Sequence, residues 1–418
     1  MREMKDSGIS WVGEIPKEWS VWRNKYIFKI TKDIVLPSKS YQLLSLTTTG
    51  IKEKDENDNG GKVPENYDGY QIVKENDLVM CLFDLDCSAV FSGLSPYNGM
   101  ISPAYKVLKV KKRIANEQYY RYWFNYVGSK RFYKQYSKSL RFTLNADEFN
   151  RLFSLLPPLD EQQRIAEFLD RECGKIDGLK ADIQAQIDTL EQYKRSVITE
   201  AVTHGLNPSA PMKDSGAGWM PLIPLHWKAD KLEFHLRQRG IKNQIDKQVL
   251  SLYREYGIVP KDSRDDNHNV TSEDVSDYRY VRVGDFVVNK MKAWQGSVAV
   301  SNYEGIVSPA YFVYEFSDDL INKRYFHYLM RNKTYATEFR RLSGGIREGQ
   351  WDLPSEALNN TIILLPPLDE QQEIADYLDN KCAEIEQIIA DKKSQIETLD
   401  VYKKSLIYEY VTGKKEAV

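Results

Sequence analysis

The sequence predicts an α+β protein: two equivalent, pseudo-symmetric mixed α/β domains separated by two long antiparallel, coiled-coil-like helices. Three observations predict it. The 418 residues are enough for two to four domains of ordinary size. A long segment occurs twice in the same order. Each copy ends in about 45 residues with a heptad pattern. The apolar fraction of 42% and the charged fraction of 28% are typical of a globular chain and exclude a mostly disordered one.

Two motifs carry the repeat. LPPLDEQQRIAEFLD at Leu156–Asp170 returns as LPPLDEQQEIADYLD at Leu365–Asp379, with twelve of fifteen positions identical. KDSGISWVGEIPKEW at Lys5–Trp19 returns as KDSGAGWMPLIPLHW at Lys213–Trp227, with eight of fifteen identical. The offsets are 209 and 208 residues, so the chain consists of two copies of one unit. This period is too long for a solenoid and indicates two equivalent domains.

The first part of each copy predicts a compact α+β domain. Short runs of β-type residues alternate with Gly, Asn and Pro turns. The periodicity becomes helical near Asn116–Ser129 and again near Asn322–Lys333. The predicted domains are residues 1–155 and 213–364.

The last part of each copy predicts one long helix. Pro157 and Pro158 disfavour helix before it, Asp160 suits the N-cap, and Gln163 completes a capping box. Gly205 and Gly413 suit the C-terminal ends. The predicted boundaries are 156–205 for the first, central helix, 206–212 for a linker and 365–413 for the second, distal helix.

Apolar residues recur every seven positions along both helical segments, although Lys392 interrupts the second stripe. A helix with one apolar stripe needs a partner, and the equivalent helix of the other copy is the nearest. Antiparallel packing would close the repeat into a ring, with Met1–Trp11 near Gly413–Val418. The predicted helix-packing residues are Ile176, Leu179, Ile183, Leu190, Tyr193, Val197, Ile385, Ile388, Leu399, Tyr402 and Leu406.

Charge is unevenly distributed although the formal net charge is only −2. Lys106–Arg141 holds eleven basic residues and one acidic residue, and Lys323–Arg347 holds seven and one. The helical segments are acidic instead. A single basic stretch is as well explained by a solvated helix face. Equivalent basic stretches in both copies favour nucleic-acid binding by the domains, with protein contacts on the helices.

Within these stretches we expect Lys130, Arg131 and Lys134 to contact phosphates. The Gly-rich segment 343–350 carries Arg347 and Gln350, which could read base edges. The segment 289–296 carries Trp294 and two further candidates, Lys290 and Lys292. The alternative to DNA contact is a core position for Trp294 and a solvated turn for Lys290 and Lys292. The candidate DNA-binding residues are Lys130, Arg131, Lys134, Lys138, Arg141, Lys290, Lys292, Arg324, Arg331, Lys333, Arg340, Arg341, Arg347 and Gln350.

Catalytic signatures are missing from the sequence. It contains no GxGxxG, no GxxxxGK[ST] and no [DNS]PP[YFW] tetrapeptide, and its five histidines lack metal-ligand spacing. Four cysteines without a CxxC pair fit a reducing cytoplasm. No run of about 18 apolar residues and no secretory signal are present. A binding protein is expected. A scaffold that binds acidic proteins, or an autonomous DNA-modifying enzyme with an unrecognised site, are the alternatives.

The tandem domains, each followed by LPPLxEQxxIAxxLD and a long heptad helix ending in EAVTHG (Glu200–Gly205) or EYVTG (Glu409–Gly413), resemble the specificity subunit of type I restriction–modification systems. The resemblance implies that 1–155 and 213–364 are target-recognition domains, each reading half of a bipartite asymmetric DNA site. It implies that the helices set the gap and dock two adenine-methyltransferase and two restriction subunits. S-adenosylmethionine, ATP and Mg²⁺ would bind those partners, leaving this chain non-catalytic, without cofactor or metal.

Overall fold

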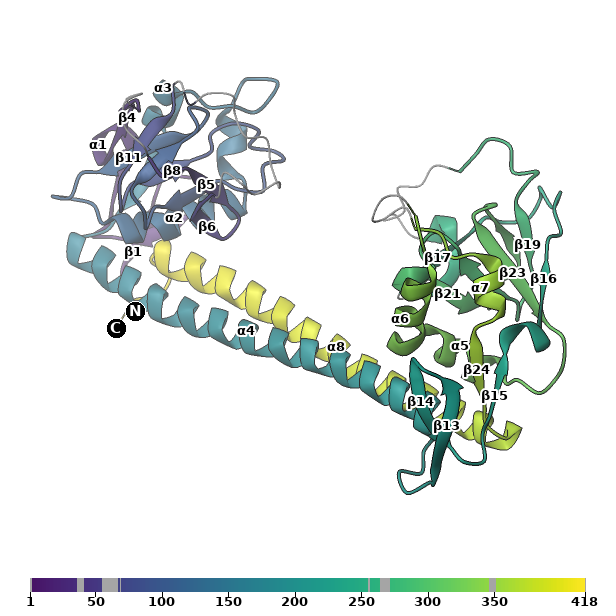
Figure 1. The fold of residues 1–418 in the computed structure, drawn as a ribbon. Coiled ribbons are helices and arrows are strands. Elements are labelled where there is room, and N and C mark those ends of the chain that lie inside the picture. Colours follow the sequence, from purple (N-terminus) through teal and green to yellow (C-terminus); the bar gives the residue numbers. More distant parts are fainter. Residues whose placement is uncertain are drawn as a thin grey trace. The chain divides into compact units, whose positions relative to one another are not determined.

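The computed structural model describes residues 2–35, 41–54, 67, 69–254, 256–263, 271–345 and 351–417. The chain divides into two compact units. The first unit comprises Met1–Ile183 and Lys393–Val418, and the second comprises Gln184–Lys392. Each unit therefore contains one mixed domain and half of each long helix (Figure 1). This division differs from the expected one, in which the helices are segments separate from the domains.

The first unit is built on a four-stranded antiparallel sheet of order β4-β11-β8-β9, with two-stranded pairs β1–β2, β3–β12, β5–β6 and β7–β10 around it. Its elements are β1 (Met4–Asp6), β2 (Glu14–Pro16), β3 (Ser20–Arg23), α1 (Asn24–Ile27), β4 (Phe28–Thr31), β5 (Leu44–Thr47), β6 (Gly50–Glu53), β7 (Gln71–Val73), β8 (Leu78–Met80), β9 (Ser92–Leu94), β10 (Gly99–Ile101), β11 (Lys106–Val110), α2 (Glu117–Ser129), η1 (Phe132–Tyr136), α3 (Ala146–Arg151) and β12 (Phe153–Leu156).

The second unit repeats this topology, with a four-stranded sheet of order β16-β23-β20-β21. The repeat read from the sequence is thus also a repeat of the fold. Its elements are β13 (Met212–Ala217), β14 (Met220–Pro224), β15 (Lys228–Lys231), η2 (Leu232–Phe234), β16 (Leu236–Arg239), β17 (Leu250–Tyr253), β18 (Gly257–Pro260), η3 (Lys261–Ser263), β19 (Arg279–Val281), β20 (Phe286–Asn289), η4 (Ala293–Gln295), β21 (Val298–Val300), β22 (Gly305–Val307), β23 (Tyr311–Phe316), α5 (Lys323–Arg331), α6 (Lys333–Leu342), α7 (Ser355–Asn359) and β24 (Ile362–Leu365).

The expected helices of the domains form at the predicted places. Asn116 caps α2, because its side chain accepts a hydrogen bond from the backbone N–H of Tyr119 at 3.0 Å. Asn322 caps α5 in the same way. The second unit adds a break: Asn332 ends α5 and caps a further helix, α6. The apolar faces of these helices bury aromatic side chains in the core of each unit.

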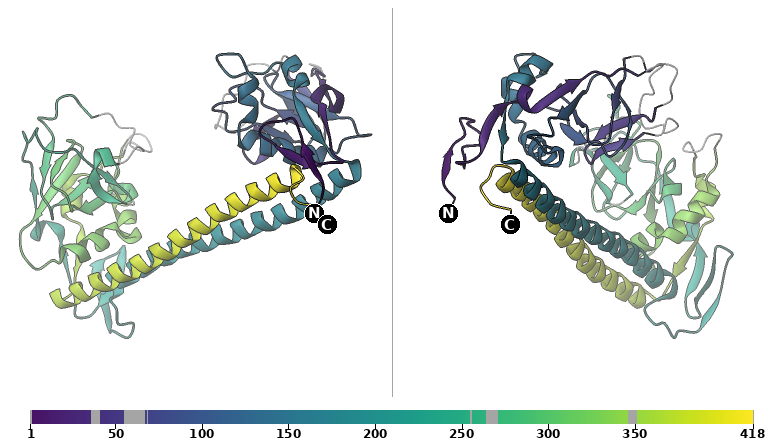
Figure 2. Two further views of the ribbon diagram at one scale, coloured as in Figure 1. Left: turned by 180° about the vertical axis from the view of Figure 1, so that it is seen from behind. Right: turned by 90° about the vertical axis from the view of Figure 1, so that its left-hand side faces the viewer.

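The long helices are α4 (Leu159–His204) and α8 (Leu368–Val411), within three residues of the predicted ends. Each unit shows them antiparallel and side by side (Figure 2). In the first unit Lys403 Nζ donates to Asp177 Oδ1 at 2.7 Å. In the second unit Lys392 Nζ donates to Gln186 Oε1 at 2.5 Å. The antiparallel coiled-coil-like arrangement is confirmed.

One of the two predicted rows of packing residues is correct. Ile176, Ile385 and Leu406 are buried, and the remaining members of that row are half-buried. Those remaining members are Ile183, Leu190, Val197 and Leu399. This row lies on the seam where α4 and α8 meet, as a heptad pattern predicts.

The other predicted row is wrong. Its residues are between 44% and 56% exposed and lie outside the seam. They are Leu179, Tyr193, Ile388 and Tyr402. The true second row lies four residues after the first, not three, and includes the buried Ile187 and Ile389. Lys180 and Lys194 occupy the same row, and their ammonium groups pair with acidic side chains of α8. The aliphatic part of a lysine side chain can cover apolar surface while its ammonium group reaches a polar partner. A pattern search restricted to apolar residues therefore misses this row.

The two ends of the chain meet in the first unit. Near the C-terminal end, Lys414 Nζ donates to the backbone oxygen of Glu14, and Val411 and Ala417 belong to the same buried cluster as Ile9 and Val12. Tyr119 Oη donates to the backbone oxygen of Val411 at 3.0 Å. The expected proximity of the chain ends is therefore confirmed for the described residues.

Because the ends meet, a circularly permuted chain is expected to fold like the original. The ends would be joined by a short Gly/Ser linker and the chain reopened at the exposed residues 207–209. We expect a shift of the thermal unfolding midpoint below about 4 °C, since neither change removes a buried contact. Reopening the chain inside α2 is the control and should prevent folding. An unfolded permutant opened at 207–209 would contradict the expectation.

Candidate nucleic-acid interface

The repeated LPPLDEQQ motif joins each mixed domain to its long helix. Gln162 is buried, and its Nε2 donates to the backbone oxygens of Ile114 and Pro157 at 2.9 and 2.8 Å. Its Oε1 accepts from the backbone N–H of Asn116 at 2.9 Å. A side-chain amide that satisfies three backbone groups fixes the start of α4 against α2.

The second copy of the motif makes the same three bonds. Gln371 Nε2 donates to Leu320 O and Pro366 O at 2.9 Å each, and Oε1 accepts from Asn322 N–H at 2.8 Å. Gln162 and Gln371 therefore make equivalent hydrogen bonds in the two units. The sequence alone identified the motif but not this role.

The glutamate of the motif meets the KDSG…W box. Glu161 is buried, accepting two hydrogen bonds from the Arg2 guanidinium and one from Trp19 Nε1 at 2.8 Å. These hydrogen bonds raise the pKa of Arg2 above its ordinary value. In the second unit Glu370 accepts from Trp227 Nε1 at 3.1 Å. The two repeated motifs thus form one joint in each unit.

A further pair of equivalent contacts lies along each joint. Tyr122 Oη donates to Asp170 at 2.7 Å, and Tyr328 Oη donates to Asp379 at 2.8 Å. Both aspartates close the LPPLDEQQ…LD motif. The glutamine, the glutamate and the closing aspartate of the motif therefore attach each domain to its long helix.

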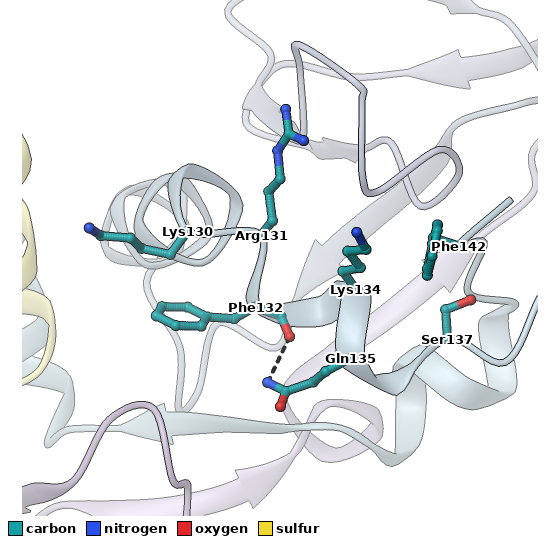
Figure 3. A pocket seen from close by; sticks show the side chains of 7 residues that line it. All are labelled: Lys130, Arg131, Phe132, Lys134, Gln135, Ser137 and Phe142. Carbon is teal, nitrogen blue, oxygen red and sulfur yellow. Dashed lines mark hydrogen bonds between the residues drawn. The ribbon is translucent and has the colours of Figure 1, made fainter.

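Three of the five candidate residues of the first unit line an open concavity beside η1 (Figure 3). Its volume is about 470 Å³. Lys134 Nζ lies 4.4 Å from the centroid of the Phe142 ring, a cation–π contact that holds the charge in place. The lining residues are Lys130, Arg131, Phe132, Lys134, Gln135, Ser137 and Phe142. Three of the predicted phosphate ligands thus lie together, which suits a phosphate backbone.

The backbone places Arg131 outside the helix. Its φ of 52° and ψ of 33° are left-handed values, which end α2 and begin η1. Its side chain and that of Lys130 are exposed and extend in different directions (Figure 3). Lys138 and Arg141, in the segment that follows η1, are exposed as well. Four of the five candidates of this unit are exposed, and Lys134 is half-buried.

In the second unit two candidate arginines pair with carboxylates of the protein. Arg324 pairs with Asp376 at 2.7 Å and with Asp379, and so belongs to the joint with α8. Arg341 makes two hydrogen bonds to the buried Glu338, at 2.7 and 2.6 Å. Both side chains remain exposed beside these carboxylates, and their contact with DNA stays a prediction.

Arg331, another candidate, is half-buried and contacts groups of the protein itself. Its Nη2 donates to the backbone oxygen of Arg254 at 2.6 Å, and its Nη1 lies 2.7 Å from His327 Nε2. Burial and the Arg331 charge lower the pKa of His327 to about 4, so the ring is neutral at neutral pH. This pair braces α5 against the β17–β18 hairpin.

Another candidate of the second unit, Arg340, lies beside a pair of tryptophans. Trp294 and Trp351 have ring centroids 5.5 Å apart, and the Arg340 guanidinium carbon lies 5.8 Å from the Trp351 ring. Trp294 is half-buried, intermediate between a core and a surface aromatic. Lys290 pairs with Asp352 at 3.2 Å. Lys292 and Lys333 are exposed, whereas Arg347 and Gln350 lie outside the described residues.

The described residues contain neither a metal site nor a membrane-spanning helix. Among the described residues, no group of three or more His, Cys, Asp or Glu side chains is arranged to hold a metal ion. In the same residues, no helix is both long and apolar enough to cross a membrane.

Known proteins share both the sequence pattern and the fold. Residues 241–398 match the family model of the type I restriction modification DNA specificity domain. The chain is 26% identical over 369 residues to the type I restriction enzyme MjaVIII specificity subunit of Methanocaldococcus jannaschii, covering 82% of this chain and 80% of that protein.

Two solved structures share the fold at 14% identity. One comes from work on assembly and conformational transition of a type I R-M system, with a TM-score of 0.69 and coverage of 96% of this chain and 99% of that chain. The other is the HsdS subunit from Thermoanaerobacter tengcongensis, with a TM-score of 0.51 and coverage of 96% and 98%.

A mixed α/β unit that occurs twice, each time attached to a long antiparallel helix pair, defines a class of two-domain proteins with spacer helices. The resemblance to the specificity subunits of type I restriction–modification systems is confirmed, and residues 241–398 match the family model of their DNA specificity domain.

Proposed function

We propose that each unit reads one half of a bipartite, asymmetric DNA site. The observation that carries the proposal is that one fold occurs twice with different basic surfaces. The first unit presents Lys130, Arg131 and Lys134 around a concavity, and the second presents the exposed Lys292 and Lys333 and a tryptophan pair with Arg340 beside it. Two different half-sites require two different binding surfaces, and the same fold can carry both.

We also propose that α4 and α8 set the gap between the half-sites and dock adenine-methyltransferase and restriction subunits. Two properties of the helices support this. Residues 160–203 carry ten acidic and six basic side chains, which disfavours DNA contact. Four large apolar side chains on the outer faces of the two helices are exposed and offer contact area to a protein partner. They are Leu179, Tyr193, Ile388 and Tyr402. S-adenosylmethionine, ATP and Mg²⁺ would bind those partners, and this chain would contribute recognition alone.

Selection from a random duplex library tests the proposal. The chain, assembled with an adenine-methyltransferase subunit, should enrich two short sequences separated by a fixed gap. Exchanging the basic residues of one unit should change one half-site only. A scaffold would show no enrichment and no steep salt dependence. An autonomous enzyme would methylate DNA when the chain is incubated alone with S-adenosylmethionine.

Replacing Lys130, Arg131 and Lys134 with alanine is expected to weaken binding to all DNA sequences alike. Each lost phosphate contact should flatten the slope of log K against log salt by about 0.9, so three contacts give a change of about 2.7. Fluorescence anisotropy over a salt series measures this slope. Lys175→Ala on α4 is the matched control and should leave the slope unchanged. An unaltered slope in the triple variant would remove the concavity from the interface.

A further inference from the structure

One edge of the first unit carries an exposed aromatic–cation surface, formed by Trp22, Arg23, Lys25, Tyr26 and Phe153. The three aromatic side chains are between 41% and 52% exposed. Trp22 and Arg23 end β3, Lys25 and Tyr26 lie on α1, and Phe153 pairs with Arg23 across the β3–β12 ladder. Three large exposed aromatics along one short edge are unusual for a surface that meets only water.

The cations of this surface are held against the rings. Arg23 Cζ lies 5.6 Å from the centroid of Phe153, and Lys25 Nζ lies 4.8 Å from the centroid of Tyr26. In the part of the chain that the structure describes, neither cation is within ion-pair distance of a carboxylate. The surface therefore presents two positioned positive charges that are not neutralised by the fold.

The second unit shows that the fold does not need this surface. Its equivalent strands, β15 and β24, pair in the same way. The positions of Trp22, Arg23, Lys25, Tyr26 and Phe153 are there taken by Asp230, Lys231, Glu233, Phe234 and Ile362. Lys231 pairs with Glu233 at 3.7 Å, and Asp230 lies 3.5 Å from His235 Nε2. An internally neutralised surface thus serves the same architecture.

We propose that the aromatic–cation surface of the first unit docks an acidic segment of a partner protein. An apolar side chain of that segment would pack against the aromatic rings, and its carboxylates would meet Arg23 and Lys25. Trp, Tyr and Arg are the residues that dominate binding energy at protein interfaces. Since the second unit lacks the surface, the partner binds once per chain. The proposal is independent of how DNA is read.

The geometry favours a protein segment over single-stranded nucleic acid. Bases stack on free ring faces. Here Lys25 lies over the Tyr26 ring and Arg23 over the Phe153 ring. Trp22 and Tyr26 meet edge to face, with planes inclined at 82° and centroids 6.4 Å apart, so they form no parallel platform.

A random-peptide display library selected on the full chain tests the proposal. The unit-2 residues provide a variant whose substitutions the fold accepts at equivalent positions: Trp22→Asp, Lys25→Glu and Phe153→Ile. The wild-type chain should enrich peptides in which acidic residues flank an aromatic or aliphatic residue. Individual enriched peptides should lose about tenfold or more in affinity for the variant. Phe234→Ser in the second unit is the matched control and should change nothing.

Two further measurements complete the experiment. Circular dichroism and thermal unfolding check that the variant folds, and Lys25→Glu alone, a change at an exposed side chain, replaces it if it does not. Identical peptide selection by the wild-type chain and the variant would overturn the proposal. A loss confined to single-stranded oligonucleotide binding would overturn it in favour of nucleic acid. A dimer of the wild-type chain that dissociates in the variant would overturn it in favour of a second copy.

Discussion

Replacing Glu161 with alanine is expected to destabilise the first unit by about 3 kcal/mol. The buried carboxylate accepts from the Arg2 guanidinium and from the Trp19 indole N–H. Its removal leaves a partly buried cation and a buried donor without an acceptor, and breaking a buried pair in this way typically costs about 3–5 kcal/mol. The lower end applies because Arg2 is partly exposed. Urea unfolding followed by tryptophan fluorescence should show one of two transitions moving to lower urea.

Glu370→Ala supplies the matched control in the second unit. Glu370 accepts from Trp227 at 3.1 Å and lies 2.7 Å from His226 Nε2, but the His226 side chain is half exposed. Water can replace part of what is lost, so about 1 kcal/mol is expected. Equal losses for the two variants, or no loss for Glu161→Ala, would show that burial of this joint does not decide its strength.

Adding one heptad to each long helix is expected to abolish binding to the original DNA site and create binding to a wider one. The insertions belong at 184–188 in α4 and at 393–397 in α8, where the two compact units adjoin along the helices. Seven residues add about 10 Å at 1.5 Å per residue and restore the seam. At about 3.4 Å per base pair, the preferred gap should grow by up to about three base pairs. Selection from duplexes with variable gaps measures it.

A two-residue insertion at both places is the control for this experiment. It rotates the following seam by about 200°, since each residue turns an α-helix by about 100°. The helix pair should then be destabilised rather than lengthened. The half-site sequences should stay unchanged in the heptad variant, because neither recognition surface is altered. If that variant keeps the original gap, the docked partner subunits, and not α4 and α8, determine the spacing.

The positions of α4 and α8 could be predicted because their signals are local. Consecutive prolines precede each helix, an acidic first turn follows, and a glycine ends it. Gly205 and Gly413 adopt φ values of 80° and 71°, which glycine reaches without strain. The repeat needed no structure either, because equal sequences at a constant offset report equal folds.

The seam between the helices could be predicted only in part. A heptad count places one row correctly, as Ile176 and Ile385 show. The count does not show whether the second row lies three or four residues after the first. The prediction placed Leu179 in that row because it is apolar, whereas the row contains Lys180. The structure resolves this because Lys180 pairs with Asp400, more than two hundred residues away in the sequence.

The sequence by itself determined the duplicated α+β architecture, the two long helices and the resemblance to specificity subunits, because each is written in residues that are neighbours along the chain or recur at one offset. Only the tertiary structure decided which basic residues remain available. Lys130 and Arg131 are exposed, Arg324 is exposed but paired with Asp376, and Arg331 is half-buried with its guanidinium bonded to a backbone oxygen. A side chain's charge is a property of its type, but the carboxylate or carbonyl that satisfies it is brought near only by folding.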